Sequence, residues 1–217
     1  MLIKNIDEMV SSYLLEIEAV KFRFNPLFTY TTGLQSPIYT DCRKIISFPD
    51  IRRKIVNYFF ELMANNIRFD DIDYVSGTAT AGIPLAAFIA DKLDIPMIYV
   101  RSSSKEHGLQ QMVEGHLEKG SKVVVIEDLY STGSSAIHNA NSIREVGGIV
   151  DYSMAIMTYE IPEAEINFKK NNIKTFSLTT GKKVAKKAFE KKILSKEEQI
   201  KVLEWFDNPL GVTKKTK

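Results

Sequence analysis

One stretch near the middle of the chain limits the possible folds more than any other. It is VVVIEDLYSTGSSA, residues 123–136, in which an apolar run leads directly into two acidic residues and a turn of small residues. A short apolar run of this kind is typical of a strand buried on both faces, as in a parallel sheet covered by helices. The Ser, Thr and Gly residues that follow favour a turn into a helix. The sequence therefore predicts a strand, a turn and a helix in direct succession.

The rest of the chain repeats this alternation of strands and helices. Strands are predicted within 71–77, 96–102, 122–129 and 150–160, and helices within 6–20, from about 48 onward, within 81–94 and within 134–148. Helix, short strand and further helices are expected after Pro162. Strands that alternate with helices favour an open, doubly wound α/β sheet that is mostly parallel. We expect one domain, because 217 residues fit a single α/β core with appendages.

Composition narrows the range of partners. The formal net charge is only +2, and the basic segment 181–192 lacks interleaved aromatic residues, so it is interpreted as a solvated helix face and not as a nucleic-acid site. A single cysteine, Cys42, excludes an intrachain disulfide and agrees with a reducing compartment. No signal peptide and no membrane span are predicted. We expect a cytoplasmic protein with small-molecule partners, no nucleic acid and no membrane.

The acid pair and the turn point to a sugar phosphate. Open α/β sheets bind ligands at the carboxyl ends of their strands, which is where Glu127 and Asp128 lie in the sequence. The turn at 131–135 offers backbone N–H groups, hydroxyls and a helix N-terminus, which together hold phosphate. Carboxylates repel phosphate but accept hydrogen bonds from vicinal sugar hydroxyls. The pattern therefore predicts a ribose 5-phosphate site.

This stretch resembles the phosphoribosyl-pyrophosphate (PRPP) signature of type I phosphoribosyltransferases, in which strand, acid pair and Thr-Gly loop come in this order. The resemblance implies the fold of that family: a doubly wound, mostly parallel sheet with helices on both faces and a small hood from the N- and C-terminal segments. It implies an N-terminal helix and hood over 1–48, a PRPP-binding core over 49–160, and C-terminal helices and tail over 161–217. The implied PRPP-binding residues are Thr78, Ala79, Arg101, Lys105, His107, Glu127, Asp128, Leu129, Tyr130, Ser131, Thr132, Gly133, Ser134 and Ser135.

The polar segment after residue 100 carries a second resemblance. RSSSKEHG is similar to the catalytic loop of orotate phosphoribosyltransferases, and here its cations are Arg101, Lys105 and His107. In that family such a loop stabilises the negative charge that grows on the departing pyrophosphate. The resemblance implies that these three residues are catalytic. It also implies a homodimer in which the 101–115 loop is shared between subunits.

Two further segments resemble the same family. Residues 28–44, FTYTTGLQSPIYTDCRK, are similar to the region that covers the base, and residues 76–86, SGTATAGIPLA, to the pyrophosphate-binding loop. Ser131 corresponds to the hydroxyl that contacts orotate. The implied reaction transfers the phosphoribosyl group of PRPP to orotate, giving orotidine 5′-phosphate and pyrophosphate in pyrimidine biosynthesis. The implied cofactor is Mg²⁺, bound mainly through PRPP without a dedicated protein metal site.

The chain departs from the family at several positions. Many members carry a lysine where this sequence has Ala81, Ser102 or Gln35, and an arginine near the position of Tyr159. These departures remove positive charge from a site for a dianionic base and a polyanionic donor. Neutralisation is therefore expected to rest on the loop cations and Mg²⁺, with Arg43 or Lys44 near the base.

Two alternatives share the same donor site. One is a phosphoribosyltransferase for another base, and the other is a non-catalytic regulator that senses PRPP on the same fold. The cation cluster in the loop favours an enzyme, because a sensor need not stabilise a leaving group.

Overall fold

The computed structural model describes residues 5–30, 33–102 and 112–209. Its centre is a six-stranded sheet in the order β10-β9-β8-β5-β6-β7, in which neighbouring strands are parallel except for β6 and β7. The strands of this sheet are β5 (Tyr74–Thr78), β6 (Met97–Val100), β7 (Val113–Glu114), β8 (Lys122–Tyr130), β9 (Ile149–Thr158) and β10 (Lys174–Thr180). The expected α/β fold class is confirmed.

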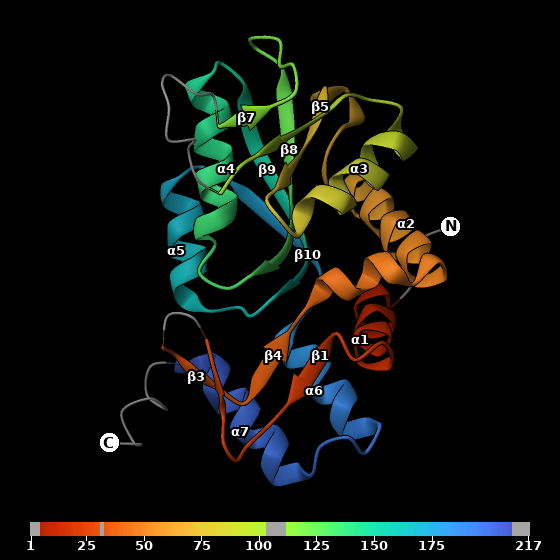
Figure 1. Ribbon diagram of the computed structural model, residues 1–217, viewed down its shortest axis with the longest axis vertical. Helices are drawn as coiled ribbons and strands as arrows, with labels where there is room; N and C mark the ends of the chain where they lie inside the picture. The colour runs from red at the N-terminus through yellow and green to blue at the C-terminus, as the bar shows by residue number, and fades with distance from the viewer. Residues whose placement is uncertain (1–4, 31–32, 103–111, 210–217) are drawn as a thin grey trace.

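Helices cover both faces of the sheet (Figure 1). They are α1 (Ile6–Glu16), α2 (Pro49–Asn66), α3 (Gly82–Leu93), α4 (Ser134–Glu145), α5 (Pro162–Lys170), α6 (Gly181–Glu190) and α7 (Lys196–Asp207). Strand β8 explains why two layers form: Val124 and Ile126 join the core under α2 and α3, whereas Val123 and Val125 join the core under α4 and α5. Alternate residues of a strand point to opposite faces, so a continuous apolar run needs cover on both.

A smaller lobe, the hood, lies below the sheet in Figure 1 and combines the two ends of the described chain. Its strands are β1 (Val20–Phe22), β2 (Phe28–Thr29), β3 (Gln35–Ser36) and β4 (Ile38–Thr40), and β1 pairs antiparallel with β4 as β2 does with β3. Helices α6 and α7 complete it, and the expected hood from both chain ends is confirmed.

Local signals fix where the hood helices begin. Ser195 forms a capping box at the start of α7: its hydroxyl accepts from the Glu198 N–H at 3.2 Å, and the Glu198 carboxylate accepts from the Ser195 N–H at 2.8 Å. Thr180 caps α6 by accepting from the Lys183 N–H at 3.3 Å. Each cap pairs backbone donors that a helix N-terminus otherwise leaves unpaired.

The polar segment that follows Val100 contains a short strand. Val113 and Glu114 form β7, which pairs with Val100 and Tyr99 of β6. Val113 and Glu114 therefore belong to the central sheet and not to the irregular part of this segment. The described helices include none long and apolar enough to span a bilayer. The expected division of the chain at residues 48 and 160 stays a prediction.

Candidate active site

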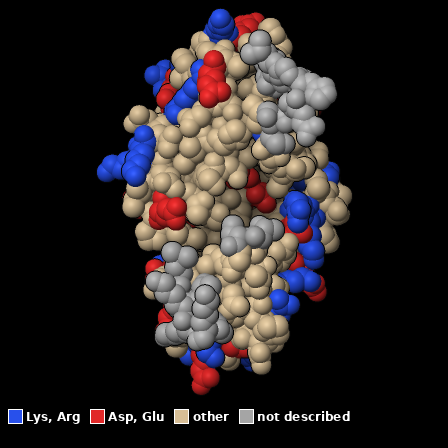
Figure 2. All heavy atoms as spheres, turned by 60° about the vertical axis from the view of Figure 1, so that its left-hand side comes forward, with Lys and Arg blue, Asp and Glu red and all other residues tan. Residues whose placement is uncertain are grey.

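The acid pair lies at the carboxyl end of β8, as the sequence predicts. Glu127 is buried, and its Oε1 accepts from the backbone N–H of Asp128 at 3.0 Å, while Oε2 has no hydrogen-bond partner among the described residues. A buried carboxylate oxygen without a donor is costly, so its presence indicates a partner that comes from outside the chain. Figure 2 shows acidic atoms in the hollow between the sheet lobe and the hood.

Burial and mutual repulsion control the charge of this pair. Burial, followed by the negative charge of Asp128, raises the pKa of Glu127 well above its ordinary value. Burial likewise raises the pKa of Asp128, although its hydrogen bond with Glu127 opposes the rise. The free protein therefore keeps a proton on this pair to a higher pH than an isolated carboxyl group would.

The turn after β8 leads into α4 at Gly133, as predicted. Packing against α5 is an additional reason for a glycine at this position. Gly133 has a φ of +79° and a side-chain carbon there would come within 2.6 Å of the Phe168 ring. Thr132 and Ser134 are linked through their hydroxyls at 3.2 Å, and Ser131, Ser134 and Ser135 are exposed. The turn therefore presents hydroxyl and N–H groups to solvent while its glycine packs against α5.

Tyr130 and Leu129 turn their side chains away from this turn. The Tyr130 hydroxyl shares a hydrogen bond of 2.6 Å with Ser153, and its ring packs edge-on against Phe168 at 4.9 Å between centroids. Leu129 packs against the core on the opposite face. Only backbone groups of these two residues remain for a ligand at the turn.

The predicted pyrophosphate loop follows β5. Thr78 is buried, whereas Ala79 is half-buried and Thr80 is exposed before α3 begins. A side-chain carbon on Gly82 would lie 2.4 Å from the Ile126 carbonyl oxygen. Small residues in this loop leave backbone N–H groups accessible to an anion, and Gly82 also lets α3 pack directly on the β8 backbone.

Arg101 lies immediately after β6, beside both turns. It lines a cavity of about 260 Å³ together with residues of the two turns and of α4: Thr78, Ala79, Val100, Ser102, Ser134, Ser135, His138 and Asn139. Its guanidinium is 3.9 Å from the Glu114 carboxylate of β7. The structure therefore brings Arg101 together with the predicted phosphate and pyrophosphate turns. The other two predicted catalytic residues, Lys105 and His107, lie outside the described residues.

Hydrogen bonds connect the predicted base-covering region to the rest of the hood. Tyr159, which stands near a position where many family members have arginine, donates to the Thr40 hydroxyl at 3.0 Å and shares a bond of 3.2 Å with the Tyr30 hydroxyl. Trp205 of α7 donates its indole N–H to the Gln35 carbonyl at 2.8 Å. The Trp205 side chain is fully buried and thereby anchors α7 in the hood.

The segment after β4 contains a buried cysteine and the two cations, Arg43 and Lys44, that were expected near the base. Cys42 is buried, and its pKa is raised by burial and then by the charge of Asp128, so it lies near the acid pair as a neutral thiol. Arg43 pairs with Asp41 at 2.6 Å, and its charge lowers the pKa of Asp128. Lys44 instead reaches the Ile17 carbonyl at 3.5 Å. Arg43 is thus the cation of this segment that acts on the site.

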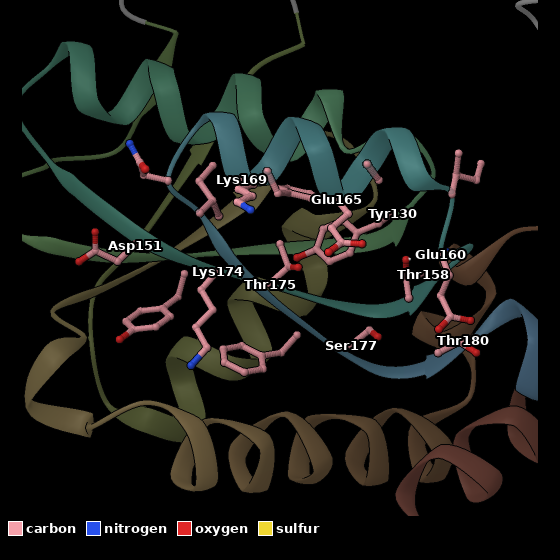
Figure 3. Close-up of a pocket in the computed structure, with 17 residues that line it drawn as sticks. Tyr130, Asp151, Thr158, Glu160, Glu165, Lys169, Lys174, Thr175, Ser177 and Thr180 are labelled. Atoms are coloured by element: carbon pink, nitrogen blue, oxygen red, sulfur yellow. Dashed lines mark hydrogen bonds between the residues drawn. The ribbon is translucent and has the colours of Figure 1, made fainter.

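Another cavity of the described chain lies away from the acid pair. It has a volume of about 790 Å³ and runs between α5 and the edge strand β10. Figure 3 shows Asp151 at one end and Thr158, Glu160 and Thr180 at the other. Neither Glu127 nor Asp128 lines it, so its size is no guide to the predicted chemistry.

Sequence reasoning missed one buried polar residue beside the site. Asn139 of α4 is fully buried and hydrogen-bonds to both Ser76 and Thr78 of β5. A signal was present, because this asparagine lies at helical spacing from Ala136 and Ile143, which are buried apolar residues of α4.

The parallel sheet, the acid pair at the end of β8 and the glycine turn into α4 define a phosphoribosyltransferase, and residues 47–148 match the family model of the phosphoribosyl transferase domain. The chain is 42% identical over 200 residues to an orotate phosphoribosyltransferase from Coxiella burnetii, an alignment that covers 92% of this chain and 95% of that protein. It belongs to the orotate phosphoribosyltransferase family.

Solved structures agree on the fold. A UMP synthase from Leishmania donovani superimposes with a TM-score of 0.78 at 22% identity, over 92% of this chain and 42% of that chain. The chain thus spans under half of that larger protein. An orotate phosphoribosyltransferase from Aeropyrum pernix superimposes with a TM-score of 0.70 at 26% identity, over 83% of this chain and 99% of that chain.

Proposed function

We propose that the protein transfers the 5-phosphoribosyl group of PRPP to orotate, giving orotidine 5′-phosphate and pyrophosphate in pyrimidine biosynthesis. One observation carries this proposal: Glu127 is buried at the end of β8, directly before an exposed turn of hydroxyls and backbone donors, and its Oε2 has no partner in the part of the chain that the structure describes. Ribose hydroxyls are the donors that such an oxygen lacks, and a 5-phosphate is the group that such a turn holds. Family membership supports orotate as the acceptor.

Each end of PRPP has its own binding elements in this proposal. Glu127 and Asp128 bind the ribose hydroxyls, the backbone from Leu129 and Tyr130 into the 131–135 turn binds the 5′-phosphate, and Ser131 also contacts orotate. Thr78, Ala79 and Arg101 bind pyrophosphate. These assignments are supported by the cavity that joins Thr78 and Arg101 to the first turn of α4.

The chemical step breaks the bond between ribose C1′ and pyrophosphate oxygen and forms a bond from C1′ to a ring nitrogen of orotate. Negative charge grows on the pyrophosphate and positive charge on the ribose. Arg101, with Lys105 and His107 of the 101–115 loop, stabilises the departing anion once water is excluded. The carboxylates of Glu127 and Asp128 face the ribose, where they favour its positive charge.

Magnesium fits this arrangement as a companion of PRPP. The described residues contain no group of three or more His, Cys, Asp or Glu side chains that could hold a metal. Mg²⁺ in phosphate-binding enzymes is held by one or two carboxylates together with substrate oxygens. Glu127 and Asp128 supply such carboxylates near the ribose, and the ion when bound would neutralise the pyrophosphate.

A spectrophotometric assay tests the activity. The protein is mixed with PRPP and Mg²⁺, and loss of orotate absorbance is followed, with adenine, hypoxanthine and uracil in parallel reactions. Turnover of orotate alone is expected. Turnover of another base instead would replace orotate by that base, and PRPP binding without turnover of any base would indicate a regulator.

The subunit arrangement is a separate part of the proposal. We infer a cytoplasmic homodimer in which the 101–115 loop of one subunit reaches the site of the other. Lys105→Ala and Glu127→Gln would each be inactive alone, but subunits exchanged between them would form heterodimers with one intact site. Such mixing should recover about a quarter of wild-type activity. No recovery despite proven exchange would place the loop in its own subunit.

A further inference from the structure

A chain of buried polar side chains joins α4 to β5. Ser76 donates its hydroxyl to Asn139 Oδ1 at 2.9 Å, and Asn139 Nδ2 donates to Thr78 Oγ1 at 3.0 Å. Ser76 and Asn139 are fully buried, and Thr78 is 5% exposed. Their surroundings on this face of the sheet are apolar, with Tyr74 and Ala140 among the neighbours in the core.

The direction of these bonds leaves the hydroxyl hydrogen of Thr78 for an acceptor outside this chain of three side chains. The Asn139 amide is fixed because its oxygen accepts from Ser76 and its nitrogen donates to Thr78. Thr78 Oγ1 therefore accepts within the chain, and its own hydroxyl hydrogen remains free for another acceptor. The carboxyl of Glu127 is close enough for the Thr78 hydroxyl to lower its pKa, against the larger effects of burial and Asp128.

Packing alone does not require these polar groups. Burying an amide costs free energy that its hydrogen bonds only offset, and apolar groups of the same shape can replace a bonded pair with little change in stability. Removing one partner, in contrast, leaves the other unsatisfied. What the polar chain adds is a fixed geometry between two elements, since a hydrogen bond constrains distance and direction more than an apolar contact does.

The two elements lead to the two anion-binding turns. Helix α4 begins at the turn 131–135, and β5 ends at Thr78, where the pyrophosphate loop starts. Asn139 lies one to two helical turns after the 131–135 turn, and it donates to Thr78, the last residue of β5. It is thus placed to set the spacing between them.

We propose that Asn139 is a positioning residue that holds the 5′-phosphate turn and the pyrophosphate turn at the separation that PRPP requires. The inference rests on the proposed function, because it assigns one phosphate group of the donor to each turn. Asn139 acts through Thr78 and Ser76, the two residues to which its amide is hydrogen-bonded.

A ligand with two anchored ends reports on the spacing between its anchors, whereas each half reports on one anchor only. The test is therefore calorimetric binding of PRPP, ribose 5-phosphate and inorganic pyrophosphate, each with Mg²⁺, to wild type and Asn139→Leu. The variant should bind PRPP about tenfold or more weakly, while its affinities for the two halves change by less than about threefold. The KM for orotate at saturating PRPP should stay near the wild-type value.

An isosteric variant separates shape from bonding. Asn139→Asp keeps the shape but has no N–H, so it removes the donor to Thr78 and draws the Thr78 hydroxyl hydrogen toward itself. It should show the same selective loss of PRPP affinity. Ser11→Ala is the matched control. Ser11 of α1 is fully buried, and its hydroxyl is hydrogen-bonded to that of Thr179 in β10 at 2.8 Å, away from both turns.

Equal loss of all three ligands in the Asn139 variants would overturn the positioning role, as would unchanged PRPP affinity or the same selective loss in Ser11→Ala. Wild-type protein that bound none of the three ligands would overturn the proposed function, and this inference with it. Wild-type turnover combined with an unaffected Asn139→Asp variant would overturn the positioning role alone.

Discussion

Gly82 at the start of α3 lies so close to β8 that a side-chain carbon on it would stand 2.4 Å from the carbonyl oxygen of Ile126. The obstacle is backbone, so no rotamer change relieves it. Ile126 directly precedes Glu127, which means that the packing of α3 and the placement of the ribose-binding carboxylate depend on the same contact.

Gly82→Ala should therefore damage both stability and donor binding. We expect a loss of about 2–3 kcal/mol in the free energy of unfolding, as for other overpacked sites, because α3 must move off β8. The KM for PRPP should rise about tenfold with the displaced carboxylate. Gly120→Ala is the control for donor binding: Gly120 has a positive φ of +85°, which Gly82 does not, and no described residue lies within 4 Å of an added carbon. A control that raised the KM for PRPP equally would contradict this reasoning.

Gly133→Ala differs because its obstacle is a side chain. The substitution places a left-handed residue against the Phe168 ring and should cost about 2–3 kcal/mol in unfolding free energy. Combining it with Phe168→Leu removes the contact but not the backbone strain. Denaturant unfolding of both single variants and the double variant should give a favourable coupling of about 1 kcal/mol or more. Simple additivity would exclude the Phe168 contact as the cause.

The acid pair should make stability depend on pH with a defined sign. The pKa of Glu127 is raised above its ordinary value of 4.5, so above that pH the folded state holds more protons than the unfolded state, and stability falls as pH rises through the folded pKa. Asp128 and Cys42 face the same region, and their pKa values are raised as well.

Glu127→Gln removes this penalty. It should match wild type near pH 4, where Glu127 is protonated in both states, and exceed it at pH 8 by about 1.4 kcal/mol for each unit of pKa shift. PRPP affinity should be lost. Thermal unfolding from pH 4 to 8 measures the difference, and a variant less stable than wild type at pH 8 would refute the prediction.

Trp205→Phe tests the connection between α7 and the base-covering hairpin. The variant keeps an aromatic ring but removes the hydrogen bond that the Trp205 indole donates to the Gln35 carbonyl, which should cost about 1–2 kcal/mol. Because Gln35 lies in β3, which pairs with β2 in the region predicted to cover the base, the KM for orotate should rise more than the KM for PRPP. Phe206→Leu is the matched control, since it loosens the same buried cluster without touching this bond. Equal effects on both substrates would contradict a specific role.

Features encoded by local pattern could be predicted from the sequence. The run from Val123 to Ile126 has too many consecutive apolar residues for an exposed strand, and Gly133 follows it at a turn, so β8, the acid pair and α4 were all foreseen. Their positions relative to one another follow from the general rule that parallel strands end at a common edge.

Features that depend on distant partners could not be predicted. Trp205 is bonded to Gln35, but nothing near Trp205 in the chain identifies this partner. The pairing of Val20 with Thr40 and the strand at Val113 depend on neighbours chosen by the whole fold. Asn139 lies at helical spacing from the apolar residues Ala136 and Ile143, yet its partners on β5 are identified only when α4 is packed.

The bond between Trp205 and Gln35 joins residues 170 positions apart, and this separation has a consequence for the order in which the protein matures. During synthesis the hairpin emerges among the first segments, and both anion-binding turns follow before α7 is made. A nascent chain can therefore form both anion-binding turns while the cover over the base still lacks its tether. The tether between α7 and the region that covers the base is therefore expected to form after both turns.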